Sequence, residues 1–136
     1  THDNNFVVLK SQLLPMLDMA LSSLFRDLED RGLLKKTLVI VTGEFGRTPR
    51  INKNAGRDHW GPSFTVPIGG GGIVGGRVIG ASNPRAERPA TTPHGPENLA
   101  ATMYHLLGID WRREYHTPEG RPIPIVNNGR VIRELL

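Results

Sequence analysis

The chain has 136 residues, of which 38% are hydrophobic, and it carries a formal net charge of +4. This length is enough for one domain with a hydrophobic core. Because cysteine is absent, disulfides and thiolate metal sites are excluded, and a bound metal would need histidine, aspartate or glutamate ligands.

The basic residues are spread along the sequence. The excess of positive charge suits an anionic substrate, but no block of five or more like charges occurs, which favours scattered surface charge over a polyanion-binding patch. We therefore rank a nucleic-acid-binding module last and expect no nucleic-acid partner. No run is apolar and long enough to predict a membrane span. The chain opens with threonine in polar material, so we expect it to be a piece of a larger protein.

The first predicted elements are a long helix and a short strand. From Leu9 to Arg31 apolar residues recur every three or four positions, which predicts a helix with one apolar stripe. Pro15 marks either a kink or the true first turn, and Gly32 is expected to end the helix. The β-branched run Leu38–Val41 is typical of a fully buried strand in a parallel sheet. A one-faced helix before such a strand is half of a βαβ unit.

The remaining elements are shorter. A long charged loop, residues 46 to 63, precedes a predicted strand at Phe64–Ile68. The glycines from position 69 to 76 match neither a P-loop nor a dinucleotide fingerprint and predict a turn. Pro96, Glu97 and Gly108 bound a helix of residues 96 to 107. Asn127–Gly129 between apolar pairs predicts a C-terminal hairpin.

Polar residues gather just after the Leu38–Val41 strand. Ligands of open α/β sheets bind outside the carboxyl ends of the strands, so a carboxylate, two guanidiniums and an Asp-His pair there indicate a metal site, an anion site, or both. The candidate metal ligands are His2, Glu44, Asp58 and His59, and the candidate oxyanion-binding residues are Arg47 and Arg57.

Each candidate has an ordinary alternative. Asp58 could equally cap backbone N–H groups in the loop. An ion pair from Glu44 to an arginine is about as favoured as metal ligation. His2, near the chain end, is more often a solvated histidine. Imidazole and carboxylate ligands suit zinc, manganese or iron better than calcium, but the spacings match no short zinc motif. No Ser-His-Asp order or nucleophile elbow is present.

Three motifs carry a resemblance to a known group of proteins: Gly43–Pro49, Ala55–Trp60 and Gly69–Ile73. Together they resemble a sulfatase-like bacterial family called "domain of unknown function 1501", within the alkaline phosphatase-like superfamily of sulfatases and phosphomutases. The resemblance covers nearly the whole chain. It implies an α/β fold in which residues 1–136 are a single-domain fragment, the C-terminal portion of an alkaline phosphatase-like sandwich. This portion would have a mostly parallel sheet, flanking helices and a C-terminal hairpin.

The resemblance also implies a site. In the superfamily an Asp-His pair after this strand binds metal, and here Glu44 and Phe45 hold those places. Phe45 cannot bind a metal, which argues against a two-metal site. Later and earlier metal-binding histidines of the superfamily match His59 and His2, with Asp58 as a candidate fourth ligand. The superfamily's nucleophile lies upstream, outside this chain.

The implied function is a metal-dependent hydrolase-like domain acting on phosphate or sulfate esters. This chain would supply part of the metal and oxyanion site, and its partner would be an anionic small-molecule or polysaccharide ester. The fragment alone is expected to be inactive. Resemblance alone suggests a periplasmic or exported protein. The rival hypothesis is a non-catalytic relative that uses the fold as an exported binding or interaction module, and Phe45 favours it.

Overall fold

The computed structural model describes residues 1–136. The chain divides into two compact units, which are described separately below. Unit 1 comprises Thr1–Ile73 and Gly80–Thr91, and unit 2 comprises Val74–Ile79 and Thr92–Leu136. All six residues of the predicted metal and oxyanion site belong to unit 1.

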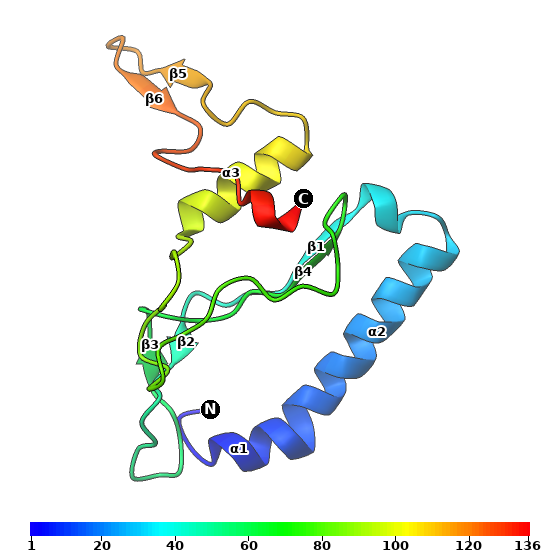
Figure 1. Cartoon of the computed structure of the whole chain (residues 1–136), viewed down its shortest axis with the longest axis vertical. Coiled ribbons are helices and arrows are strands. Elements are labelled where there is room, and N and C mark those ends of the chain that lie inside the picture. The colour runs from blue at the N-terminus through cyan, green and yellow to red at the C-terminus, as the bar shows by residue number, and fades with distance from the viewer. The chain divides into compact units, whose positions relative to one another are not determined.

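Unit 1 contains a long helical rod (Figure 1). Helix α1 (Asn5–Val8) runs through a π-helical stretch (Leu9–Leu13) into α2 (Leu14–Asp30). The π-helical stretch has a local cause. Pro15 has no N–H to donate to the carbonyl of Ser11, four residues back, so the ordinary ladder is interrupted there. A wider turn carries the helix across the interruption, and α2 continues without a break in the chain.

The predicted end of the long helix is confirmed. Gly32 adopts a left-handed conformation with φ 66°, which a residue with a Cβ rarely adopts. The N–H of Leu33 donates to the carbonyl of Leu28 at 2.8 Å, and that of Gly32 donates to Glu29 at 2.9 Å. These two bonds form a Schellman motif, which satisfies carbonyls that the helix leaves free at its end.

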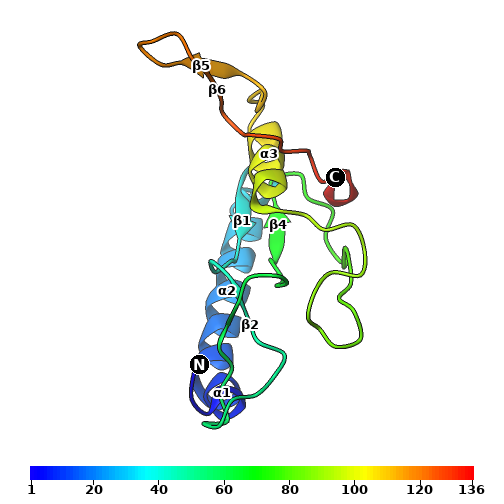
Figure 2. The ribbon, with the colours of Figure 1, turned by 90° about the vertical axis from the view of Figure 1, so that its left-hand side faces the viewer.

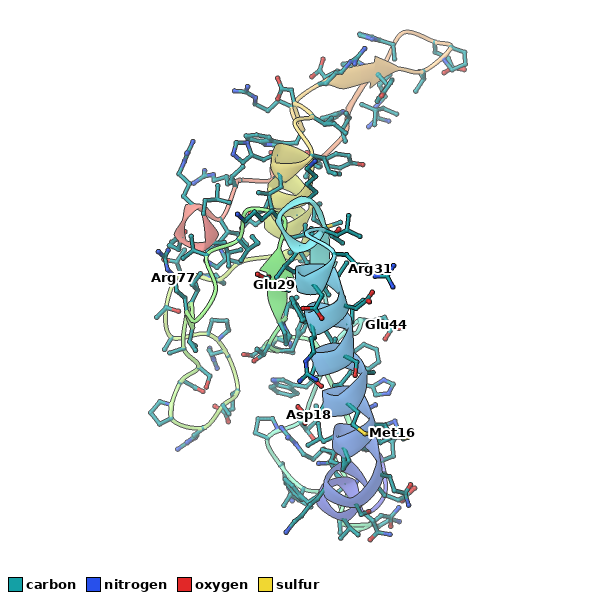
Figure 3. All side chains as sticks on the ribbon, turned by 90° about the vertical axis from the view of Figure 1, so that its right-hand side faces the viewer. Met16, Asp18, Glu29, Arg31, Glu44 and Arg77 are labelled. Carbon is teal, nitrogen blue, oxygen red and sulfur yellow. The ribbon has the colours of Figure 1, made fainter.

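Most of the apolar stripe on this helix is exposed. Leu28 is buried, but Leu13, Leu17 and Leu24 are 41 to 43% exposed. Figure 3 shows Met16 and Asp18 on the outer surface of α2. The helical run Asn5–Asp30 has a mean hydropathy of 1.2 over 18 residues and, by length and composition alone, could cross a membrane. A core helix of a globular protein satisfies the same test, so the expected absence of a span stays a prediction.

The predicted parallel sheet is wrong. Strand β1 (Leu38–Ile40) pairs only with β4 (Ile68–Gly70), and the pairing is antiparallel, with Val39 opposite Gly69. Figure 2 shows the two strands side by side. Parallel neighbours need a crossover connection, usually a helix. The chain between β1 and β4 contains no helix, so it returns in the opposite direction.

Strand β4 also begins later than predicted and includes two glycines. Of the predicted Phe64–Ile68 strand, only Ile68 belongs to β4. A Cβ on Gly69 would lie 3.1 Å from the Phe25 ring of α2, and a Cβ on Gly70 would overlap the carbonyl of Thr37. Glycine therefore lets the returning strand approach both the helix and β1. Strand β1 is only half-buried, not fully buried as predicted.

Unit 2 contains helix α3 (Pro96–Leu106), which lies where the sequence predicted it. Pro96 occupies the first turn, where its missing N–H costs no helical hydrogen bond. Gly108, with φ 73°, ends the helix. The N–H of Ile109 donates to the carbonyl of Tyr104 at 2.9 Å, so this end is also a Schellman motif.

The predicted hairpin around Asn127–Gly129 is wrong. The hairpin of unit 2 lies earlier, with β5 (Glu114–His116) antiparallel to β6 (Pro122–Pro124). The backbone N–H groups of Arg130 and Ile132 bond to side chains of α3 and not to a partner strand. The acceptors are Asn98 Oδ1 and Thr102 Oγ1, both at 2.9 Å. The segment after Asn127 is thus docked on α3, over buried Ala101, Thr102, Val126 and Ile132.

The expected architecture is therefore corrected as a whole. An alkaline phosphatase-like sandwich with a mostly parallel sheet and flanking helices does not form within this chain. The sheets are three antiparallel pairs: β1 with β4, β2 (Gly46–Arg47) with β3 (His59–Trp60), and β5 with β6. The candidate site therefore cannot lie at the carboxyl end of a parallel sheet. Most of its residues lie instead in the loop that contains β2 and β3.

Candidate metal and oxyanion site

The loop between β1 and β4 folds back on itself as a short antiparallel ribbon. Arg47 of β2 stands opposite His59 of β3, and Gly46 stands opposite Trp60. A Cβ on Gly46 would lie 2.8 Å from Cβ of Phe64, so only glycine lets the chain pass there without displacing its neighbour. The ribbon brings one guanidinium and one imidazole into register, although eleven residues separate them in the sequence.

A second contact brings the start of the chain to this ribbon. Asn4 and Asn5 donate their backbone N–H groups to the carbonyls of Asn54 and Ala55, both at 3.0 Å. The N–H of Arg57 donates in return to the carbonyl of Thr1 at 3.1 Å. These three bonds fasten the segment before α1 along the loop and place the His2 side chain over β3.

Gly56 is the position where this contact is tightest. The residue is buried, and a Cβ built on it would overlap the carbonyl carbon and oxygen of His2. Backbone, unlike a long side chain, cannot swing aside. Glycine is therefore required at position 56 if His2 is to stay where it is.

We expect Gly56→Ala to displace the start of the chain and to lower the free energy of unfolding by about 1–3 kcal/mol, as overpacking of a tight contact does. Chemical denaturation measures the loss, and NMR shifts of the His2 ring report its displacement. Gly61→Ala is the matched control, because nothing lies within 4 Å of a Cβ there. Equal stability of the two variants would contradict the role given to Gly56.

His2 uses both of its ring nitrogens. Nδ1 lies 3.2 Å from Oδ1 of Asp58, and Nε2 lies 3.0 Å from Nε2 of His59. Nη1 of Arg47 lies 3.2 Å from the same Nε2 of His2. The imidazole of His2 is therefore the centre of the cluster, with a carboxylate on one side and a second imidazole and a guanidinium on the other.

One arrangement of protons satisfies all three contacts. Arginine can only donate, so Nε2 of His2 must accept. Asp58 as a carboxylate can only accept, so His2 must carry its proton on Nδ1. His59 then donates its Nε2–H to His2. In this arrangement the single Nε2 lone pair of His2 faces both the ring nitrogen of His59 and the guanidinium of Arg47.

Asn52 holds the cluster together, and the sequence analysis missed it. Its Nδ2 donates to the carbonyl of His2 and to Oδ1 of Asp58, both at 3.0 Å. Its Oδ1 accepts the backbone N–H groups of Asn54 and Gly56, both at 2.9 Å. An asparagine that closes a turn onto the N–H two residues ahead is a recognised loop signal, and it was available here.

Comparison with known proteins decides the family. A family model described as "Protein of unknown function (DUF1501)" matches residues 1–136. The chain belongs to the DUF1501 family. No curated protein and no solved structure matches the chain. The resemblance to DUF1501 is thus confirmed over the full length, and the wider link to the alkaline phosphatase-like superfamily stays a prediction.

Asp58 of this DUF1501 chain is tuned by its neighbours. The hydrogen bond to His2, followed by that to Asn52, holds the pKa of the Asp58 carboxyl below its usual value. A lowered pKa means that the folded state favours the ionised form. The contact therefore contributes stability above the unfolded pKa of about 3.9, and this contribution is lost as pH falls through the lower folded value. The contribution is small, because His2 and Asp58 are 52% and 56% exposed.

Two predicted members lie differently. Glu44 is exposed (Figure 3), and no hydrogen bond or ion pair joins it to the cluster or to an arginine. Arg57 directs its guanidinium at the backbone: Nε donates to the carbonyl of Thr48 at 2.5 Å and Nη2 to that of Arg47 at 3.0 Å. Arg57 therefore holds β2 in place, and Arg47 is the guanidinium at the cluster.

The residues present fit a metal only in part. No group of three or more His, Asp or Glu side chains surrounds one point. Nε2 of His2 and Nε2 of His59 do face one another at 3.0 Å. Two nitrogens at tetrahedral zinc stand about 3.3 Å apart, given Zn–N bonds of about 2.0–2.1 Å. Asp58 occupies the other nitrogen of His2, where a carboxylate orients a metal-binding histidine without touching the metal.

Proposed function

We propose that this DUF1501 chain supplies a two-histidine metal site with an adjoining oxyanion-binding arginine, for phosphate or sulfate esters. The observation that carries the proposal is the contact between Nε2 of His2 and Nε2 of His59 at 3.0 Å. A ring nitrogen that faces another ring nitrogen is held there by one shared proton, and a cation replaces that proton when it binds both lone pairs.

His2 and His59 would hold the ion. Imidazole nitrogens suit zinc and iron, and the remaining coordination positions, open to water or a substrate oxygen, also suit manganese. Asp58 supports the proposal, because it fixes the proton of His2 on Nδ1 and so leaves the lone pair on Nε2. Asn52 in turn fixes the Asp58 carboxylate. Glu44 is dropped from the proposed ligands, because nothing holds its side chain at the cluster.

Arg47 would bind the anion. Its Nη1 now points at Nε2 of His2 at 3.2 Å. A cation on that nitrogen and the guanidinium repel each other, so Arg47 would turn to an anion bound beside the cation. A guanidinium fork matches two oxygens of a phosphate or sulfate group. A bound metal would supply charge that stabilises the oxyanion and lowers the pKa of a bound nucleophile.

The chain offers no activated nucleophile of its own. Thr42 donates its hydroxyl to the carbonyl of Gly43 at 2.9 Å. Thr48 donates its hydroxyl to the carbonyl of Arg50 at 2.7 Å and accepts the backbone N–H of Asp58. Neither hydroxyl meets a base. We therefore expect the chain to bind a metal and an oxyanion without hydrolysing p-nitrophenyl phosphate or p-nitrophenyl sulfate.

Titration with zinc and manganese tests the proposal, and Asp58→Asn sharpens it. Asparagine lacks the negative charge that orients His2. We therefore expect the metal affinity of Asp58→Asn to be about 10–100-fold lower than that of the unsubstituted protein. Asp3→Asn is the control, since that exposed carboxylate makes no hydrogen bond or ion pair. Isothermal titration calorimetry gives both affinities. Equal metal affinity of the two variants would remove Asp58 from the site.

The second candidate function is a non-catalytic binding module. Phe45 favours it, since its ring lies against the His59 ring with centroids 4.0 Å apart. An aromatic ring over the imidazole restricts approach from that side. A protein that binds neither zinc nor manganese, while it keeps its fold, would support this candidate over the metal site.

A further inference from the structure

A hollow outside the histidine cluster has no role in the function proposed above. It belongs to unit 1, has a volume of about 380 Å³, and is lined by Trp60, Pro62, Glu87 and Arg88. It forms where β3 meets the loop Gly80–Thr91. The polar atom of the indole is already bonded, because Nε1 of Trp60 donates to the carbonyl of Glu87 at 2.8 Å. Trp60 therefore offers the hollow aromatic surface only.

The far wall of the hollow is a hydrogen-bonded turn. Oδ1 of Asn83 accepts the backbone N–H of Glu87 at 2.8 Å, and the N–H of Asn83 donates to the carbonyl of Arg88 at 2.9 Å. An antiparallel bridge between Ser82 and Pro89 closes the turn. The carboxylate and the guanidinium thus stand on a fixed backbone beside the indole.

The lining defines the ligand chemistry. Trp60 and Pro62 give an apolar surface, while Glu87 accepts and Arg88 donates hydrogen bonds. The two charges cancel, so the hollow favours a neutral ligand over an anion or a cation. A purely apolar ligand would desolvate both charges without replacing their hydrogen bonds. A sugar ring meets every condition, because it combines an apolar C–H face with hydroxyls that donate and accept.

The hollow and the histidine cluster are separate sites. His59 and Trp60 are neighbours on β3, and neighbouring side chains of a strand leave on opposite faces. The inference therefore goes beyond the metal site and does not depend on it.

We propose that the hollow lined by Trp60, Pro62, Glu87 and Arg88 binds one pyranose ring of a neutral oligosaccharide. The indole stacks on the C–H face of the ring. Glu87 accepts from hydroxyls and Arg88 donates to them. This would give the chain a saccharide-binding surface on one face of the β2–β3 ribbon and the metal and oxyanion residues on the other.

The chain has two tryptophans, so one substitution isolates the reporter. In Trp111→Phe the tryptophan fluorescence comes from Trp60 alone. We expect cellohexaose to change this emission in a saturable way, with a Kd on the order of 1 mM or below. Calorimetry on the unsubstituted protein should give the same Kd, which guards against damage from the Trp111 substitution.

Three variants assign the contacts. We expect Trp60→Ala to weaken cellohexaose binding by about tenfold, because the free energy of aromatic stacking corresponds to about a tenfold change in Kd. Glu87→Gln and Arg88→Ala should each weaken it severalfold while the thermal unfolding midpoint stays unchanged. The metal site is tested apart: His59→Ala should leave cellohexaose affinity unaltered.

The proposal is overturned by either of two results. One is that the Trp60 emission does not change with cellohexaose up to about 10 mM, a concentration about ten times the highest Kd expected here. The other is cellohexaose binding that neither Glu87→Gln nor Arg88→Ala weakens. A protein that binds a proline-rich peptide instead of cellohexaose gives the first of these results. In the unsubstituted protein, cellohexaose binding without zinc or manganese binding would refute the proposed metal site alone, and metal binding without cellohexaose binding would refute the sugar site alone.

Discussion

Replacing His59 with alanine should abolish zinc and manganese binding, with a fall in affinity of more than about 100-fold, above the range for losing an outer partner of a ligand. The reason is geometric. His59 supplies one of the two ring nitrogens that face each other at 3.0 Å, and its removal leaves His2 as a single ligand. Equilibrium dialysis followed by metal analysis measures the effect directly.

The control for this change is His116→Ala. His116 is also an exposed histidine on a short antiparallel strand, but it belongs to β5 in unit 2. It should leave metal binding as in the unsubstituted protein. Proton release gives a further test, because metal displaces the proton between the two rings and the affinity should weaken as pH falls. Unchanged metal content in His59→Ala would end the proposed function.

Replacing Arg47 with alanine should weaken sulfate and phosphate binding by about 10–150-fold, which corresponds to the loss of about 1.5–3 kcal/mol for hydrogen bonds to a charged group. Arg47 is half-buried, and its Nη1 lies 3.2 Å from the nitrogen that would face the metal. Arg47→Lys should fall between, because lysine keeps the charge but lacks the planar fork. Calorimetry with zinc present gives the three affinities.

Arg50→Ala is the matched control for this series. Arg50 is exposed in the same loop, and its side chain makes no hydrogen bond or ion pair. The substitution removes the same formal charge, so any effect of net charge alone will be seen in both variants. Added salt should weaken this general attraction more than the Arg47 contribution. If Arg47→Ala and Arg50→Ala lose the same sulfate affinity, Arg47 has no specific role.

The helix ends were predictable because their causes are local. Gly32 and Gly108 both adopt positive φ and both close Schellman motifs. A glycine directly after an apolar helical run predicts the end of the helix without reference to any other part of the chain. The same holds for Pro96 at the start of α3.

The sheet was not predictable in the same way. The run Leu38–Val41 has the composition of a buried parallel strand, but the direction of its partner depends on how the chain returns. The loop from residue 41 to 67 contains no crossover helix, so β4 runs antiparallel. Composition alone could not show this, because parallel and antiparallel strands share β-branched residues.

Four of the candidate residues lie together in the structure, but the sequence did not predict what each of them contacts. His2, Arg47, Asp58 and His59 were selected by residue type, and the fold brings them into direct contact. Asp58 and Arg57 were given ligand roles, whereas the structure directs Asp58 at the outer nitrogen of His2 and Arg57 at backbone carbonyls. Residue chemistry is the same in both roles, so only position distinguishes them.

The amino-acid sequence by itself determined the two long helices, their glycine ends and membership of the DUF1501 family, since these depend on neighbouring residues and on motif identity. Only the tertiary structure decided that imidazoles 57 positions apart share one contact. That contact depends on Asn52, which bonds to the carbonyl of His2, and on Gly56, which has no side chain and so leaves room for the backbone of His2. Contacts at such separation are set by packing, and no local pattern records them.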